Sequence, residues 1–405
     1  MSCASWCSGW LRHACCLCIC FLGWCLETGA ETLHWGPFHA TLGLQAGVSY
    51  TDNVKTSQTN EQGDIGISFG PVVNAGLSLP IITSGREELM TVSTSLGFSY
   101  KRYLRRGQAS NFNSPIGFTL TLPLHVQEWL VNVNDSFRFT NDPLESALAV
   151  SVTTVEQYSN TASISGMRRF GRFALTLAAQ RSDKWAPSMP STEESINSFS
   201  ITPSVFLQEN FSVFWANSIG FVFPEDLKTR SNGINMTSTI GVAGQITPVL
   251  SGSIGVGYVH SEFDSIVTAT GPQPGGKTDG VSANVGLSYA HPLRPNTAHS
   301  ISLTYSPGVT ATLNNSNFQT SYGGAYTIAH RLNAYLTLSP QVSWMRTISE
   351  GGLSHSEMDM MAVQIALSRS FGSHLSGTIN CRHQETSGQT SYKVNIISLQ
   401  LNYMF

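Results

Sequence analysis

The sequence predicts an all-β chain that forms one transmembrane, antiparallel, up-and-down β-barrel of about 18 strands, with about 16 as the alternative. Three observations predict this fold. From about residue 38 onward, apolar residues recur at every second position over windows of roughly ten residues. Short and long polar connections between these windows alternate along the chain. Only 12% of the 405 residues are charged, although the hydrophobic fraction is an ordinary 41%.

The alternation is clearest at the C-terminus, where Ile397, Leu399, Leu401, Tyr403 and Phe405 alternate with polar residues or methionine. The same pattern occurs in six other windows, which are 42–50, 92–100, 118–126, 211–223, 250–258 and 281–289. Strict alternation gives a strand one apolar and one polar face. No window of similar length has the 3.6-residue period of an amphipathic helix, so we expect an all-β chain.

The connections between these windows indicate hairpins. Short ones are expected near 80–88, 127–128, 168–172, 208–210, 247–248, 291–297, 330–332 and 372–374. Longer polar ones lie between them, and both chain ends fall on the side of the short turns. An even strand number, short periplasmic turns and long extracellular loops are typical of a bacterial outer-membrane barrel. A soluble β-sandwich is the alternative, but its outer face would carry more charged residues than this chain has.

The composition excludes several other classes of protein. With 22 basic and 25 acidic residues, the net charge of −3 does not fit a protein that binds nucleic acid. A helical transporter would need many apolar runs of about 20 residues. The aromatic fraction of 10% is too high for a disordered chain.

Residues 1–30 are predicted to be a secretory signal peptide, and residues 31–405 the barrel domain. Arg12 precedes an apolar run from Ala14 to Leu26, which is too short for a bilayer core of about 30 Å. The small residues before Glu31 place cleavage after Ala30. Seven of the eight cysteines lie in the first 25 residues, so cleavage would leave Cys381 alone and no internal disulfide.

Aromatic residues at the predicted strand ends indicate a girdle at the membrane interface. They are Tyr50, Tyr100, Tyr103, Trp129, Phe223, Tyr258, Tyr289, Tyr305, Trp344 and Phe371.

The two ends of the predicted barrel resemble known outer-membrane proteins. Leu399, Leu401, Tyr403 and the terminal Phe405 are similar to the C-terminal strand that the bacterial barrel-assembly machinery recognises. The segment 47–54 resembles the first strand and loop of β-barrel porins associated with exopolysaccharide gene sets. The resemblance implies an integral protein of a Gram-negative outer membrane, in contact with lipids and lipopolysaccharide. It implies no catalytic residues.

If the apolar face meets lipid, the polar face lines a lumen with little net charge. Such a lumen suits the passive passage of small hydrophilic solutes or saccharides with weak ion selectivity. The candidate lumen residues are Asn132, Asn134, Arg138, Gln180, Asn284, Gln341, Asn380, Arg382, Gln400 and Asn402. Asp135 and Asn217 fall on the lipid side in this register, so a bulge or a register shift is expected at each.

Two other functions stay open at this point. A non-conducting barrel, plugged by the loops 140–158 or 260–280, would have an adhesion or structural role. An outer-membrane hydrolase is the third candidate, but no catalytic motif occurs in residues 31–405, and neither an enzyme nor a cofactor is expected. The oligomeric state, monomer or trimer, is also open.

A His-Ser-Glu-x-Asp pattern occurs twice, at the ends of two strands near the long loops. The two sets are His260, Glu262 and Asp264, and His355, Glu357 and Asp359. In extended chain the three side chains of a set point the same way, so they could bind Ca²⁺ or bridge cations to lipopolysaccharide phosphates. A solvated, charged rim is the alternative.

Overall fold

The computed structural model describes most of the chain from Leu33 to Phe405. The described ranges are 33–53, 63–83, 85–104, 111–113, 116–140, 156–187, 193–225, 231–268, 271–273, 275–290, 296–309, 318–350, 356–388 and 391–405. The predicted signal peptide lies outside them. Among these residues there is no helix long and apolar enough to cross a membrane.

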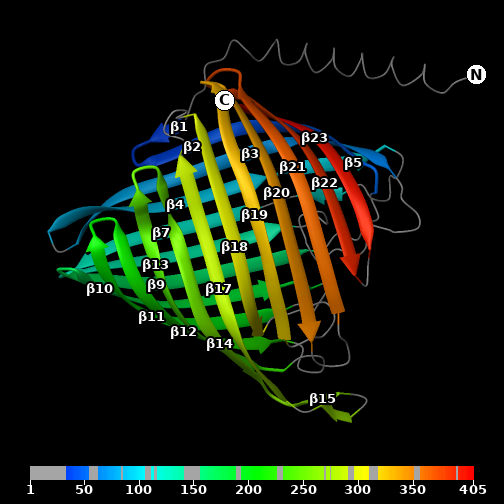
Figure 1. Ribbon diagram of the computed structural model, residues 1–405. Coiled ribbons are helices and arrows are strands. Elements are labelled where there is room, and N and C mark those ends of the chain that lie inside the picture. The colour runs from blue at the N-terminus through cyan, green and yellow to red at the C-terminus, as the bar shows by residue number, and fades with distance from the viewer. Residues whose placement is uncertain are drawn as a thin grey trace, which may run out of the picture.

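The described chain forms one large antiparallel sheet that closes into a barrel (Figure 1). Its first wall strands are β2 (Phe38–Thr51), β3 (Asp64–Thr83), β4 (Arg86–Gly97), β7 (Ile116–Val126), β8 (Trp129–Thr140) and β9 (Gln157–Phe170). The next are β10 (Phe173–Trp185), β11 (Glu194–Gln208), β12 (Phe211–Pro224), β13 (Gly233–Thr247), β14 (Leu250–Phe263) and β17 (Gly276–Ala290). The last are β18 (Thr297–Val309), β19 (Phe318–Asn333), β20 (Leu336–Glu350), β21 (Ser356–Ser370), β22 (Leu375–Gly388) and β23 (Tyr392–Met404).

Five shorter strands complete the sheet or extend from it. β5 (Ser99–Tyr103) continues β4 along β3, and β6 (Asn111–Asn113) pairs with β5. β1 (Leu33–Trp35) pairs with the start of β2. β15 (Ile266–Thr268) and β16 (Gly271–Gln273) form a separate hairpin that projects beyond the barrel (Figure 1).

Each wall strand pairs with the next in the chain, and β2 pairs with β23 to close the ring. The result is a closed barrel of 18 antiparallel strands, which confirms the predicted fold and strand number. A bilayer offers no hydrogen-bond partner to a free sheet edge, so closure is what allows a sheet to cross it.

The register aligns the apolar faces of neighbouring strands. Val48 pairs with Ile67 on one side and with Leu399 on the other, and all three side chains are 42–46% exposed. Large apolar side chains are exposed in the same way on every wall strand except β8. On β8, Val131 and Val133 continue the pattern through their pairs with Leu124 and Leu122 of β7. The apolar side chains therefore point outward, and the alternate residues point into the barrel.

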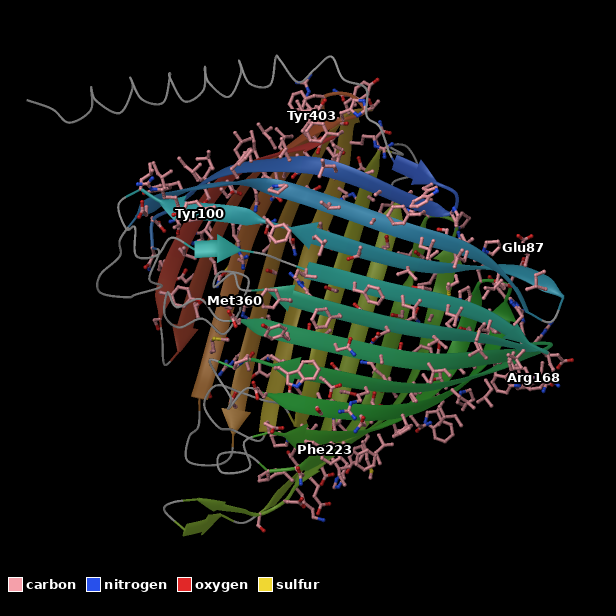
Figure 2. All side chains as sticks on the ribbon, turned by 180° about the vertical axis from the view of Figure 1, so that it is seen from behind. Glu87, Tyr100, Arg168, Phe223, Met360 and Tyr403 are labelled. Carbon is pink, nitrogen blue, oxygen red and sulfur yellow. The ribbon has the colours of Figure 1, made fainter. Side chains whose placement is uncertain are left out.

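Short turns connect the strands at one end, as expected. In the turn between β7 and β8, Gln127 adopts a φ of 56°, and in the turn between β9 and β10, Gly171 adopts a φ of 63°. One turn differs from the expectation of 330–332: it lies at 334–335, because β19 continues through His330, which contacts Thr297 of β18 at 2.7 Å. Figure 2 shows Glu87 and Arg168 together at this end.

The loops at the other end fall mostly outside the described residues. The segment 260–280, expected to be one long loop, is an exception. β14 runs on to Phe263, β17 starts at Gly276, and the β15–β16 hairpin lies beyond the barrel, so the described part of this segment does not plug it. Of the segment 140–158, only its two ends are described.

Two expectations about register are wrong. Asp135 pairs with Leu120 and Asn217 with Ile201 in continuous registers, so neither position has the expected bulge or shift. Both residues lie on the outward face.

A polar cluster fastens the seam between β2 and β23 at the loop end. The backbone N–H of Asn395 donates to Asp52 Oδ1 at 2.7 Å, and its side-chain amide donates to Asp52 Oδ2. His383 of β22 contacts Asn395 Oδ1 at 2.7 Å. Asn53 donates from its side chain to the carbonyl of Lys393 at 3.0 Å. These contacts extend the seam beyond its last backbone pair, Thr51 with Ile396.

We expect Asp52→Ala to destabilise the barrel, since it removes two hydrogen bonds to a carboxylate at the seam. The loss should be about 1–2 kcal/mol in the free energy of unfolding. Urea titration, followed by the heat-dependent shift of the folded barrel on electrophoresis, measures it. Asp264→Ala is the control, because Asp264 is an exposed carboxylate at the same end. Equal midpoints for both variants would contradict a role for Asp52 in the seam.

Candidate functional site: the barrel interior

All ten candidate lumen residues lie on the face opposite the exposed apolar residues. Asn132 and Asn134 pair with Pro123 and Thr121 of β7, next to the outward Leu122 and Leu124. The rest occupy equivalent inward positions on their strands: Arg138, Gln180, Asn284, Gln341, Asn380, Arg382, Gln400 and Asn402. Most inward positions between them carry Ser, Thr or Gly. The interior is therefore a polar surface with few charges.

Planar polar side chains concentrate on the inner face of β20–β23, which we call the amide wall. It consists of Gln341, Gln364, Asn380, Arg382, Gln384, Gln400 and Asn402. Gln341 pairs across strands with Gln364, and Gln364 with Arg382. Arg382 Nη2 donates to Gln384 Oε1 at 2.6 Å, and Gln400 Nε2 donates to Asn402 Oδ1 at 3.2 Å.

The amide wall keeps hydrogen-bonding capacity that the protein itself does not use. Asn380 Oδ1 and Arg382 Nε are buried and have no hydrogen-bond partner among the described residues. One is an acceptor and the other a donor, and they lie two residues apart on one inward face. Water or a polar solute in the lumen would satisfy such groups.

The inner face of β13–β17 is different, because small residues dominate it. Asn284 lies so close to Gly255 that a Cβ there would meet Asn284 Oδ1 at 2.6 Å. A Cβ at Gly257 would meet Thr239 Oγ1 at 2.4 Å. The glycines thus let Asn284 and Thr239 lie against the wall, which leaves space in the lumen on this side.

At the loop end the inner face is covered. The inward residues Val222, Val259 and Ser261 are 3%, 1% and 0% exposed, and Thr386 of β22 is 3% exposed. In the middle of the barrel, by contrast, the inward Gln180, Asn284 and Gln400 are exposed. The interior is therefore most enclosed near the loops.

The described residues contain no group of three His, Cys, Asp or Glu side chains able to hold an ion. Metal binding by the two His-Ser-Glu-x-Asp sets therefore stays a prediction. His260 and Glu262 face outward. His260 contacts Asp279 at 2.7 Å, and Lys277 forms an ion pair with Glu262 at 2.8 Å. Asp264 follows the end of β14 and is exposed.

The second set has the same arrangement. Arg346 forms an ion pair with Glu357 at 2.7 Å and lies 3.7 Å from Asp359. His355 lies outside the described residues. A basic residue from the neighbouring strand thus sits among the carboxylates of each set. Ion pairs of this kind form a charged rim near the loops, above the apolar band.

The outer surface below this rim is apolar and bears the aromatic residues expected there. Tyr50, Tyr100, Phe223, Tyr258, Tyr305, Trp344 and Phe371 are 38–52% exposed. A closed barrel with an apolar outer band and aromatic residues at its edges is the form that β-proteins take in a bilayer. The chain is therefore a transmembrane β-barrel.

Two members of the amide wall, Gln364 and Gln384, were not among the candidates from sequence. The same alternation would have found them, because Gln364 lies between the outward Val363 and Ile365. No sequence pattern indicates the contact between the seam residues Asp52 and Asn395, since they are 343 residues apart.

No family model matches the sequence. No curated protein is similar to it in sequence. The fold, however, is similar to solved porin structures. OccK1 (OpdK) of Pseudomonas aeruginosa aligns with a TM-score of 0.50 and 11% identity, over 91% of this chain and 98% of that one. OpdL of the same organism aligns with a TM-score of 0.48 and 13% identity, over 92% and 99% of the two chains. At this identity, the likeness to OccK1 supports the barrel fold alone.

The inward and outward assignment can be tested with Cys381, which faces outward between Ile365 and Ile397. In proteoliposomes we expect a charged, membrane-impermeant maleimide to leave Cys381 unlabelled, because lipid covers the thiol and the charged reagent does not enter lipid. In the double variant Asn380→Cys, Cys381→Ser, the thiol faces the lumen and should be labelled quickly. Both proteins should be labelled fully after denaturation. Rapid labelling of native Cys381 would contradict the register.

Proposed function

We propose that this barrel is a passive pore of the bacterial outer membrane for small hydrophilic solutes or saccharides. The observation that carries the proposal is a polar interior inside a closed barrel of 18 strands with an apolar outside. Barrels of this strand number normally enclose an aqueous channel. One solved protein of similar fold, OpdK of Pseudomonas aeruginosa, is an outer-membrane protein and was also solved with vanillate.

Solute passage along the amide wall accounts for its chemistry. Asn, Gln and Arg side chains offer donors and acceptors in fixed planes, which suits hydroxyl and carbonyl groups of a neutral solute. Few charges face the middle of the lumen, so neither sign of ion is strongly favoured. Arg138 and Arg382 are two inward cations on which a weak preference for anions would depend.

Substitution of both arginines by Glu should shift the ion selectivity toward cations. Planar-bilayer reversal potentials in a salt gradient measure the shift, and Arg138→Glu, Arg382→Glu is the variant. Arg369→Glu is the matched control, because Arg369 lies on the outward face above Phe371 and should leave the potential unchanged. An unchanged potential in the double variant would place the conducting path elsewhere.

A non-conducting barrel with an adhesion or structural role is the second candidate. The covered inner face at the loop end favours it, because an enclosed end obstructs passage. Single-channel recordings of the refolded barrel distinguish the two. Channel events above background support the pore, and their absence in several preparations would favour the second candidate. A hydrolase has no support among the described residues.

The proposed location requires export and assembly. Residues 1–30 would act as the signal peptide, and cleavage after Ala30 would leave β1 intact. The barrel-assembly machinery would recognise the C-terminal residues Leu399, Leu401, Tyr403 and Phe405. The charged rim near the loops would contact lipopolysaccharide. Phe405 also has a structural role, since its N–H donates to the carbonyl of Leu42 at 2.8 Å and its ring packs edge-on against Tyr403.

Deletion of Phe405 should reduce the amount of folded barrel in outer-membrane fractions. Refolding of the same variant from urea into detergent separates assembly from stability. We expect refolding to be little affected, because only one backbone hydrogen bond of the seam is lost. Phe371→Ala, which removes an exposed aromatic ring at the same end, is the control. Normal amounts in the membrane would contradict a role of Phe405 in assembly.

A further inference from the structure

Polar residues interrupt the apolar outer band at one level on β8 and on β12. The short turns provide a common reference for depth. Eight wall strands begin directly after a short turn, and in each of them the sixth residue after the first residue of the strand faces outward. On six such strands this residue is apolar or a cysteine: Val92, Ala179, Val256, Leu303, Val342 and Cys381. On β8 it is Asp135, and on β12 it is Asn217.

This level lies within the hydrocarbon region. Six residues along a strand tilted by about 40° rise about 15 Å from the short turns. The aromatic residues at the loop-side edge of the apolar band, such as Tyr258 and Trp344, lie two residues further from the short turns, so both side chains lie inside the band. A polar group that meets only lipid there loses hydrogen bonds that water would provide.

Asn217 has a donor to spare. Trp215 Nε1 donates to Ser238 Oγ at 2.9 Å, and Ser238 Oγ donates to Asn217 Oδ1 at 2.8 Å. This chain of hydrogen bonds holds the carboxamide in place through its oxygen. In the part of the chain that the structure describes, its N–H groups have no acceptor.

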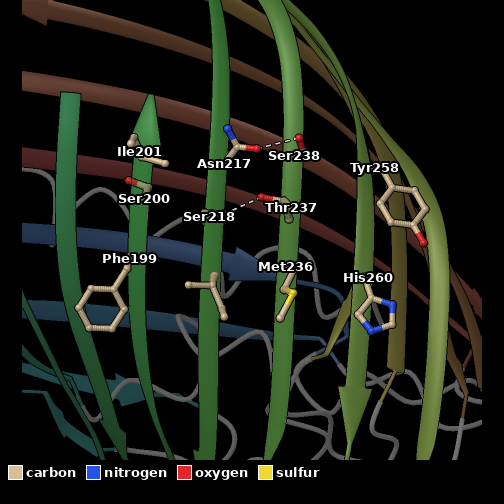
Figure 3. Close-up of a pocket in the computed structure, with 11 residues that line it drawn as sticks. Phe199, Ser200, Ile201, Asn217, Ser218, Met236, Thr237, Ser238, Tyr258 and His260 are labelled. Carbon is tan, nitrogen blue, oxygen red and sulfur yellow. Dashed lines mark hydrogen bonds between the residues drawn. The ribbon is translucent and has the colours of Figure 1, made fainter. Parts of the chain in front are cut away.

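Asn217 borders a hollow of about 530 Å³ on the outer surface of β11–β14 (Figure 3). Phe199, Ile201, Met236, Tyr258 and His260 line the hollow as well, so it extends from Asn217 toward the charged rim. A second hollow, of about 410 Å³, lies nearby on the same wall, between Phe173 and Trp215. Acyl chains could fill such hollows, but at this depth they have no acceptor for an amide.

Asp135 is a matching acceptor. It lies between Leu120 and Ala162 of the neighbouring strands, on the outward face. With its nitrogen turned toward β8, the Asn160 side chain donates to Asp135 Oδ1 at 3.1 Å. A carboxylate accepts several hydrogen bonds, so Asp135 retains capacity for a further donor.

We propose that β12 of one copy of this chain packs against β8 of a second copy, with Asn217 donating to Asp135 across the interface. Two copies that cross the membrane in the same direction bring these residues to the same depth. β8 and β12 are four of the eighteen strand steps apart, about 80° of the circumference, so each copy has two separate contact faces and the contact can repeat from copy to copy. The proposal depends on the membrane location but not on conduction.

Disulfide formation tests the contact. In a Cys381→Ser background, Asp135→Cys and Asn217→Cys barrels are mixed, reconstituted in liposomes and oxidised. We expect disulfide-linked dimers in the mixture and very few disulfide-linked dimers in either variant alone. The barrel carrying both cysteines should form longer chains of linked copies. An internal disulfide is excluded, since four strands separate the two cysteines by about 19 Å.

A control at the same depth uses the opposite wall. Val342→Cys with native Cys381 should give no linked copies, although both thiols face outward.

Asn217→Leu should weaken association about tenfold in sedimentation at varied detergent concentration, whereas Asp135→Asn keeps the acceptor and the oligomer. Unlinked, monomeric barrels would overturn the proposal, as would equal linking at the control wall or dimers from Asn217→Cys alone.

Discussion

The structure depends on one constraint, which is that every backbone N–H and C=O within a bilayer needs a partner from the protein. The sheet can meet it only by closing, and it closes where β2 meets β23. The start of β2 lies beyond the reach of β23, and β1 pairs with this remaining edge from Leu33 to Trp35. At the loop end, Asp52 and Asn395 continue the seam with side-chain contacts. Both ends of the joint are thus protected from fraying.

Closure also decides which face is polar. A strand that is paired on both sides presents alternate residues to lipid and to the lumen, and a shift of one residue would exchange them all. The inside is not uniform, however. The amide wall of β20–β23 faces the lumen with planar hydrogen-bonding groups, while glycines on β14 let Asn284 and Thr239 lie against the wall. A solute would therefore meet its polar contacts mainly on one side.

Much of this arrangement could be predicted from sequence, because alternation and turn spacing are local properties. They predicted the strand number and placed residues such as Asn132 and Arg382 on the inward face. The expected bulges at Asp135 and Asn217 were wrong for a physical reason. The preference of one polar residue for the lumen is outweighed by the many neighbouring pairs that a register shift would turn over. The contact of Asp52 with Asn395 depends on closure and could not be found from spacing.

The same reasoning gives meaning to polar residues that stay on the outside. Because the strand register does not shift to bury such residues, they occur on the outer face only where the surroundings supply a hydrogen-bond or ion-pair partner. Arg346 and Lys277 find carboxylates on adjacent strands near the loops, where water is also close. Asn217 has Ser238 for its oxygen only, and it lies inside the apolar band. A second protein surface can supply an acceptor there, so the outer wall of β8–β12 is the part of the barrel where a polar side chain lacks a partner for its donor.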